Sequence, residues 1–123
     1  MMSPADIKQV RATLRKKELK RWERNETLRL DTLEKAKTVI RNYFAAYPGT
    51  SVYLTGSIVK PGAFSTASDI DMAVEDFPGN RLDLFTDLSS LIDWPIDIII
   101  MERCEFADSI RRNATPIQKS LHH

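Results

Sequence analysis

The stretch LTGSIVKPGAFSTASDIDMAVE, residues 54 to 75, decides the fold that this sequence predicts. A Gly-Ser pair, Gly56 and Ser57, ends one apolar run, and two carboxylates separated by one isoleucine, Asp69 and Asp71, open the next. The eleven residues between Ser57 and Asp69 are mostly small or turn-forming, which is typical of a loop. The pattern therefore predicts a strand, a loop and a second strand, with the Gly-Ser pair and the carboxylates converging.

Strand and helix patterns alternate around this stretch. Residues 51–55 are β-branched and aromatic, residues 69–75 alternate between apolar and polar, and residues 95–100 repeat that alternation, so each segment predicts a strand. Apolar spacing predicts an amphipathic helix over about 82–92 and a last helix over about 105–113. The side chains expected to face the core from the helical parts are Tyr43, Phe44, Leu82, Phe85, Leu88, Leu91, Ile92, Phe106, Ala107 and Ile110.

The N-terminal third has the pattern of helix throughout. The residues SPAD provide a start signal, and neither glycine nor proline occurs between Pro4 and Pro48. One long helix or two helices divided near Asn25 would satisfy the spacing. We expect a division or a bend, because the apolar stripe thins from residue 15 to residue 27. The first segment is then expected to project as an arm.

Length and composition bound the architecture. A chain of 123 residues with 42% hydrophobic residues is expected to form one compact domain, with a helical extension at 1–47 and the main fold at 48–120. The single cysteine, Cys104, excludes an internal disulfide, and no apolar N-terminal run resembles a signal peptide. We expect a soluble cytoplasmic protein that does not bind membranes, and the histidines at 122–123 are not among the candidate site residues.

Charge is distributed unevenly. Residues 1–41 carry twelve Lys or Arg against six Asp or Glu, whereas the remainder carries six against eleven. The basic segment is suited to an acidic protein surface or to nucleic acid, and an ordinary solvated helix face is an equal alternative. The solvated face is supported because Glu18 and Glu23 interrupt the basic residues and Trp22 is the only ring available for stacking. Nucleic acid is a possible partner but not the favoured one.

The central stretch has the groups that a phosphate and a metal ion require. Asp69 and Asp71, two residues apart on a strand, point to the same side and repel each other unless a cation binds. Carboxylates without nearby Cys or His favour Mg²⁺ or Mn²⁺, and Mg²⁺ usually completes its shell with water and substrate phosphates. Gly56 and Ser57 offer a close backbone approach and hydrogen-bond donors for a phosphate. Asp97 is the expected third carboxylate.

These residues together carry a resemblance to a known family. The Gly-Ser pair, the following loop, SDIDMAV and the later IDIII resemble the minimal nucleotidyltransferase family of the DNA polymerase β superfamily. The compatible order of elements covers roughly residues 45 to 113. This chain has Val59-Lys60-Pro61-Gly62 where family members commonly have Ala-Arg-Gly, so Lys60 stands in as a point charge without the bidentate fork of arginine. The implied fold is α/β (α+β), a small mixed sheet flanked by helices, with a long helical N-terminal extension.

The resemblance implies an activity, which is transfer of AMP from ATP to a hydroxyl group with the help of two Mg²⁺ ions. The residues it assigns are Asp69, Asp71 and Asp97 as metal ligands and catalytic groups, and Gly56, Ser57 and Lys60 as nucleotide contacts. In this scheme Asp97 ligates the metal on the nucleophile's side or accepts the hydroxyl proton.

The resemblance also implies a partner. Minimal nucleotidyltransferases of this size are frequently encoded beside a helical toxin ribonuclease of the HEPN class, act as its antitoxin, and in some cases attach AMP to a tyrosine of that toxin. Two alternatives stay open. In the first, the protein would be an antitoxin that acts by docking alone. In the second, it would be a transferase that acts on a small molecule or on RNA.

Overall fold

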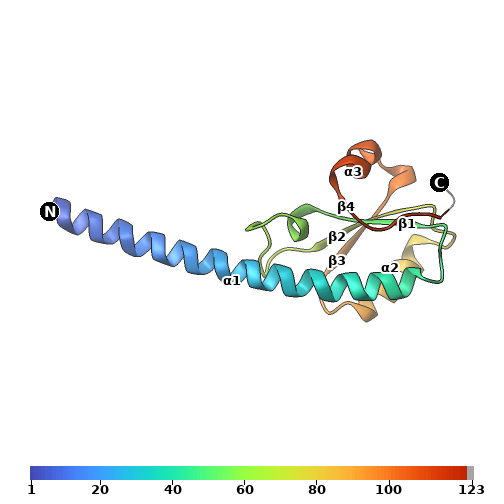
Figure 1. The fold of residues 1–123 in the computed structure, drawn as a ribbon, viewed down its shortest axis with the longest axis horizontal. Helices are drawn as coiled ribbons and strands as arrows, with labels where there is room; N and C mark the ends of the chain where they lie inside the picture. The colour runs from blue at the N-terminus through green and yellow to red at the C-terminus, as the bar shows by residue number, and fades with distance from the viewer. Residues whose placement is uncertain (122–123) are drawn as a thin grey trace.

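The computed structural model describes residues 1–121, which form a four-stranded mixed sheet packed against helices (Figure 1). The strands are β1 (Ser51–Thr55), β2 (Ile70–Glu75), β3 (Ile96–Ile100) and β4 (Thr115–Gln118). The helices are α1 (Pro4–Phe44), α2 (Arg81–Leu91) and α3 (Ala107–Asn113), with two short 3₁₀ helices, η1 (Gly56–Val59) and η2 (Met101–Arg103). The predicted combination of a small mixed sheet and a long N-terminal helix is confirmed at this level.

The sheet has the strand order β3-β2-β1-β4. β1 pairs antiparallel with both β2 and β4, and β2 pairs parallel with β3 through the crossover helix α2. The three predicted strands are confirmed to within one residue. β4 was not predicted, because Pro116 argues against a strand; it is tolerated here because β4 lies at the edge of the sheet.

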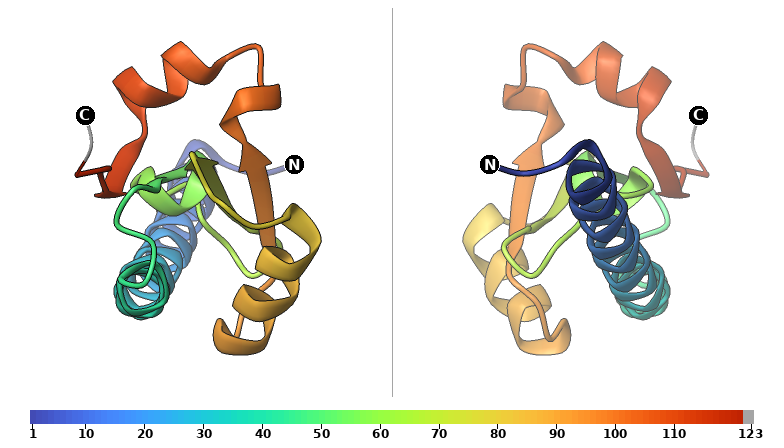
Figure 2. Two further views of the ribbon diagram at one scale, coloured as in Figure 1. Left: turned by 90° about the vertical axis from the view of Figure 1, so that its right-hand side faces the viewer. Right: turned by 90° about the vertical axis from the view of Figure 1, so that its left-hand side faces the viewer.

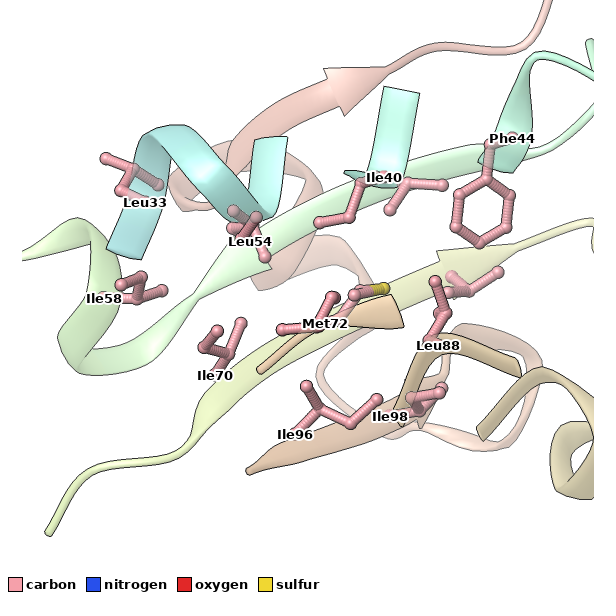
Figure 3. Close-up of a cluster of buried hydrophobic side chains, with 14 of the residues drawn as sticks. Leu33, Ile40, Phe44, Leu54, Ile58, Ile70, Met72, Leu88, Ile96 and Ile98 are labelled. Atoms are coloured by element: carbon pink, nitrogen blue, oxygen red, sulfur yellow. The ribbon is translucent and has the colours of Figure 1, made fainter. Parts of the chain in front are cut away.

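The main core lies between the sheet and the two longer helices. α1 and α2 cover one face of the sheet, and α3 lies over the other (Figure 2). Alternate residues of β2, Ile70 and Met72 among them, point toward α1 and α2, where Ile40 and Phe44 meet them (Figure 3). The intervening residue Ala73 belongs to a smaller cluster under α3. The strand alternation predicted from the sequence therefore separates two faces with different neighbours.

α1 is one continuous helix of 41 residues, so the expected division near Asn25 is wrong. Ser3 and Asp6 form a capping box at its start, and the segment where the apolar stripe thins consists mainly of residues with good helix propensity, including several Lys, Arg and Glu. The thinning marks the point where the helix leaves the domain, not a break. Residues 4–21, here called the arm, project beyond the sheet with every side chain exposed (Figure 1).

Several predicted core side chains are exposed. In α2 the buried face consists of Leu84, Leu88 and the following Ile92, which are four residues apart, so Leu82, Phe85 and Leu91 point away from the core. The prediction chose the wrong stripe because leucines occupy several sides of this helix. Phe106 is also exposed, since α3 begins only at Ala107 and Phe106 precedes its first turn. Phe44 is buried as predicted. Tyr43 is half-buried, packs against the main core and donates a hydrogen bond of 2.8 Å to Asp87.

None of the helices formed by residues 1–121 combines the length and the apolarity needed to cross a bilayer.

Candidate functional site

The three predicted carboxylates lie at the same end of two neighbouring strands. Asp71 of β2 and Asp97 of β3 are register partners in a parallel pairing, so their side chains point to the same side of adjacent strands. That side is opposite to the one on which Ile70 and its neighbours face the main core. Asp69 lies one residue before β2 and two residues before Asp71. The fold thus brings together residues that are 28 positions apart in the sequence.

Burial and two neighbouring carboxylates both disfavour the ionised form of Asp71. The pKa of the Asp71 carboxyl is raised, first by burial and then by the negative charges of Asp97 and Asp69. Asp71 is half-buried, whereas the other two carboxylates are exposed. A group whose ionised form is disfavoured by two neighbouring anions gains from a nearby cation. The cluster therefore has the electrostatic character of a cation site.

Gly56 places the Gly-Ser pair directly against this cluster. Thr55, the last residue of β1, is the register partner of Asp71, and the next residue, Gly56, has a positive φ of 76°. A Cβ at position 56 would overlap Oδ2 of Asp71 and lie 3.3 Å from its Cγ, so only glycine fits at this point without displacing the carboxylate. Ser57 follows, half-buried, in η1. The predicted convergence is present for Gly56 and the carboxylate of Asp71.

Lys60 lies on the loop that continues from η1. Its side chain is exposed, and its N–H donates a hydrogen bond of 3.1 Å to the carbonyl oxygen of Ser57. Pro61 follows, and the extended conformation of Lys60, with φ −114° and ψ 117°, is the one that a residue before proline favours. The loop places Lys60 three residues after Ser57. The backbone of Lys60 is restricted by its hydrogen bond to Ser57 on one side and by Pro61 on the other.

The second half of the loop is anchored in the core. Phe64 is fully buried and its ring lies 5.3 Å from that of Trp94, measured between centroids. The indole N–H of Trp94 donates a hydrogen bond of 2.7 Å to the carbonyl oxygen of Ser68, the residue before Asp69. These contacts fix the point at which the chain enters β2, and so the position of the first carboxylate.

Helix α1 contributes contacts to the loop that were not predicted. The Glu26 carboxylate accepts a hydrogen bond of 2.8 Å from the N–H of Gly62, and Arg29 donates one of 3.1 Å to the carbonyl oxygen of Ile58. Glu26 and Arg29 also form an ion pair with each other. The available signal was the position of Arg29, which begins the spacing of three and four residues that leads through the buried side chains to Phe44. A charged residue in such a series indicates a specific partner.

Arg81, the first residue of α2, is a second unpredicted neighbour of the cluster. Its Nη2 lies 3.8 Å from Oδ1 of Asp97, and its Nε and Nη2 donate hydrogen bonds of 3.2 and 3.1 Å to the carbonyl oxygen of Ile98. Both charged side chains are largely exposed, so the ion pair contributes little to stability. The pair instead places the guanidinium of Arg81 beside the carboxylate of Asp97. Nothing in the local sequence indicates this contact.

The carboxylates by themselves do not enclose a metal ion. Among residues 1–121, no group of three or more His, Cys, Asp or Glu side chains is placed so that it could hold a metal ion. Asp71 and Asp97 nevertheless offer two hard oxygen ligands side by side. Mg²⁺ is usually held by one or two carboxylates and completes its octahedron with water and substrate phosphates. The residues present fit a metal ion of that kind, which binds together with a phosphorylated ligand.

A comparison with protein-family models finds no match to this sequence. No curated protein is similar enough in sequence to indicate a relative. Functional inference therefore rests on the motif, the fold and the geometry described above.

Proposed function

We propose that the protein is a Mg²⁺-dependent nucleotidyltransferase of the minimal, polymerase β-like type, which transfers AMP from ATP to a hydroxyl of a partner protein. The observation that carries the proposal is the contact between Gly56 and Asp71, because it joins a phosphate-binding type of turn to a paired-carboxylate site. A solvated strand end would need neither the glycine nor the neighbouring Asp97.

In this proposal each residue has a defined task. Asp71 and Asp97 would hold the metal ion, with Asp69 completing the negative charge around it. The Ser57 hydroxyl donates to phosphate oxygens, and the ammonium group of Lys60 offsets part of their charge. When bound, Mg²⁺ supplies the positive charge that stabilises the departing pyrophosphate.

The bond changes are those of a simple displacement. The acceptor hydroxyl oxygen forms a bond to the α-phosphorus of ATP, and the bond from that phosphorus to the bridging oxygen of pyrophosphate breaks. The hydroxyl proton passes to a nearby carboxylate, and Asp97, exposed beside Asp71, is suited to receive it in the alternative in which Asp97 does not itself hold the metal ion.

The arm supports a protein acceptor. It carries seven Lys or Arg against two Asp or Glu, and its apolar side chains Ile7, Val10 and Leu14 are exposed. Eighteen residues make five turns of an α-helix, so Val10 and Leu14 lie on the same side of α1 as Leu28 and Thr32, which contact the domain. The apolar stripe of the arm thus continues the inward side of α1 past the end of the domain. An acidic partner with an apolar ridge fits this surface.

We further propose that the partner is a toxin of the HEPN class and that the protein is its antitoxin. The decisive experiment incubates a purified candidate toxin with the protein, ATP and Mg²⁺, and measures the mass of its tryptic peptides. We expect one added AMP on a tyrosine and the release of pyrophosphate. Unmodified toxin together with no pyrophosphate release from any hydroxyl acceptor would contradict the transferase proposal.

Docking without catalysis is the second candidate, and the length and exposure of the arm favour it. The two candidates separate in one comparison. If the Asp69→Asn, Asp71→Asn double variant still neutralises the toxin as the wild type does, neutralisation comes from docking. If the variant binds the toxin but leaves it active, neutralisation comes from transfer.

A further inference from the structure

Three side chains of α1 hold one segment of the loop that follows the Gly-Ser pair. The segment comprises residues 58–62, with Lys60 at its centre. Arg29 donates to the carbonyl oxygen of residue 58, and Glu26 accepts from the N–H of Gly62 at the other end. The indole of Trp22 lies against Gly62, where an added Cβ would come within 2.9 Å of its Cδ1 and overlap the ring nitrogen. α1 therefore contacts both ends of a five-residue segment.

The ion pair within this arrangement is mostly shielded from water. The side chains of Arg29 and Glu26 are 8% and 14% exposed, and hydrogen bonding from Arg29 and then from the N–H of Gly62 lowers the pKa of Glu26. Removing either partner would leave the other ionised group shielded without its counter-charge, which is destabilising. Burial of this kind is not needed merely to stabilise a helix, because exposed pairs do that at lower cost.

A second pair on the same helix shows the contrast. Glu34 and Lys37 have the same spacing of three residues and form an ion pair, but Glu34 is 71% exposed. The Glu26 pair differs in that both of its members also bind the main chain of the loop. The sequence spacing is identical, so the difference lies in what each pair faces.

We propose that Glu26, Arg29 and Trp22 are positioning residues that hold Lys60 and the adjoining turn in the geometry that binds the triphosphate of the nucleotide. This inference rests on the proposed function and extends it to residues more than thirty positions before Lys60 on a different element. Lys60 itself is exposed and lies on a flexible stem, so its contribution depends on where its backbone is held.

The physical reason is preorganisation. A loop that must be ordered when the ligand binds subtracts that ordering free energy from the affinity, whereas a loop already fixed by a rigid element does not. The segment contains Pro61 and is held at both ends, so little freedom remains for it to lose. Its attachment to a 41-residue helix, not to another loop, makes the fixed position robust.

The experiment compares Glu26→Ala with Glu34→Ala, which removes the same charge and an ion pair of the same spacing. Calorimetry measures the dissociation constant for Mg-ATP, and NMR measures hydrogen exchange at the Gly62 amide. We expect Glu26→Ala to weaken Mg-ATP binding by about tenfold and to speed exchange at Gly62, since a charge-assisted hydrogen bond is lost. Glu34→Ala should change neither. Glu26→Gln, which keeps an acceptor for the Gly62 N–H, should lie between Glu26→Ala and the wild type.

Two further variants separate positioning from general destabilisation. Lys60→Ala should weaken Mg-ATP binding, and adding Glu26→Ala to it should weaken binding little further, because both changes remove the same contact. If Glu26→Ala fails to fold, Trp22→Ala replaces it as the test, because it removes an exposed side chain. Trp22→Ala should also weaken Mg-ATP binding. Full additivity of the Glu26 and Lys60 effects, or wild-type affinity in Glu26→Ala, would overturn the positioning role while leaving the proposed function standing. Absence of Mg-ATP binding in the wild-type protein would overturn both.

Discussion

The backbone of Gly56 lies directly against the carboxylate of Asp71, so that a Cβ at position 56 would overlap Oδ2 of that side chain. Two consequences follow for Gly56→Ala. The positive φ of 76° costs an alanine about 1–2 kcal/mol of stability. The overlap adds less to that cost, because the Asp71 side chain can rotate, but the rotation moves the carboxylate away from Asp97. We therefore expect a moderate fall in melting temperature and a much larger fall in Mg²⁺-dependent transfer.

A double variant identifies the source of the loss in Gly56→Ala. If the overlap with Asp71 matters, Gly56→Ala should destabilise the Asp71→Ala protein only by the cost of placing an alanine at a positive φ. An equal loss of stability in both backgrounds, with transfer by Gly56→Ala undiminished, would show that the contact has no part in the site.

The second prediction concerns Asp69→Asn together with Asp71→Asn. We expect this double variant to lose Mg²⁺-dependent transfer while its circular-dichroism spectrum stays unchanged, because it removes charges that repel each other in the absence of a metal. The measurement is release of pyrophosphate from ATP in the presence of an acceptor. Transfer at the wild-type rate would exclude these residues as metal ligands.

The third prediction is a pH dependence of the protein without metal. The pKa of Asp71 is raised above its ordinary value of 3.8, so the folded state binds this proton more tightly than the unfolded state does. The resulting stabilisation is complete below 3.8 and is lost as the pH rises through the folded pKa. At pH 7 the ionised carboxyl therefore opposes folding, and Asp71→Asn should be the more stable protein in EDTA. The gain should stay under about 1 kcal/mol, because water still reaches the side chain.

Melting temperatures measured in EDTA at pH 7 and near pH 3 check the sign of that effect. The advantage of Asp71→Asn should be present at pH 7 and absent near pH 3. Adding Mg²⁺ together with ATP should raise the melting temperature of the wild type and leave that of Asp71→Asn unchanged, since ligand binding stabilises only the protein that binds. A larger advantage of the variant at low pH would contradict the assignment.

The strands and the carboxylate cluster could be predicted from the sequence because their signals are local. Alternation with period two fixes which side of a strand faces the core, and it placed Asp71 and Asp97 opposite their apolar neighbours before any pairing was known. The Gly-Ser pair could be recognised as a tight turn because glycine lets the backbone approach other groups closely, which few other residues allow. Each of these predictions needed only the identity of a residue and of its near neighbours.

The contacts that were missed depend on relations between distant segments. No local pattern shows that Glu26 reaches Gly62, or that Arg81 lies beside Asp97, because each contact is set by how an entire helix packs. The continuity of α1 was misjudged for a related reason. A thinning apolar stripe has the same appearance whether a helix ends or leaves the domain, and only the fold distinguishes the two.

The last prediction concerns the arm as a docking surface. Asp substitutions at Val10 and Leu14 place charges on the apolar stripe that continues the inward side of α1, whereas Leu19→Asp is the matched control. Leu19 is also exposed and lies nine residues from Val10, which is two and a half turns and therefore the opposite side of the helix. We expect the Val10, Leu14 double variant to weaken association with the proposed toxin partner by about tenfold or more, because an introduced charge must be desolvated in the complex. Leu19→Asp should have little effect.

A truncation that tests the same surface should end at residue 20, so that Trp22 keeps its contact with Gly62 and Mg-ATP binding is spared. Association should also weaken with salt, since the arm is basic. Equal effects of the stripe and control variants, or a dimer of this chain that dissociates when the stripe is substituted, would refute docking of an acidic partner.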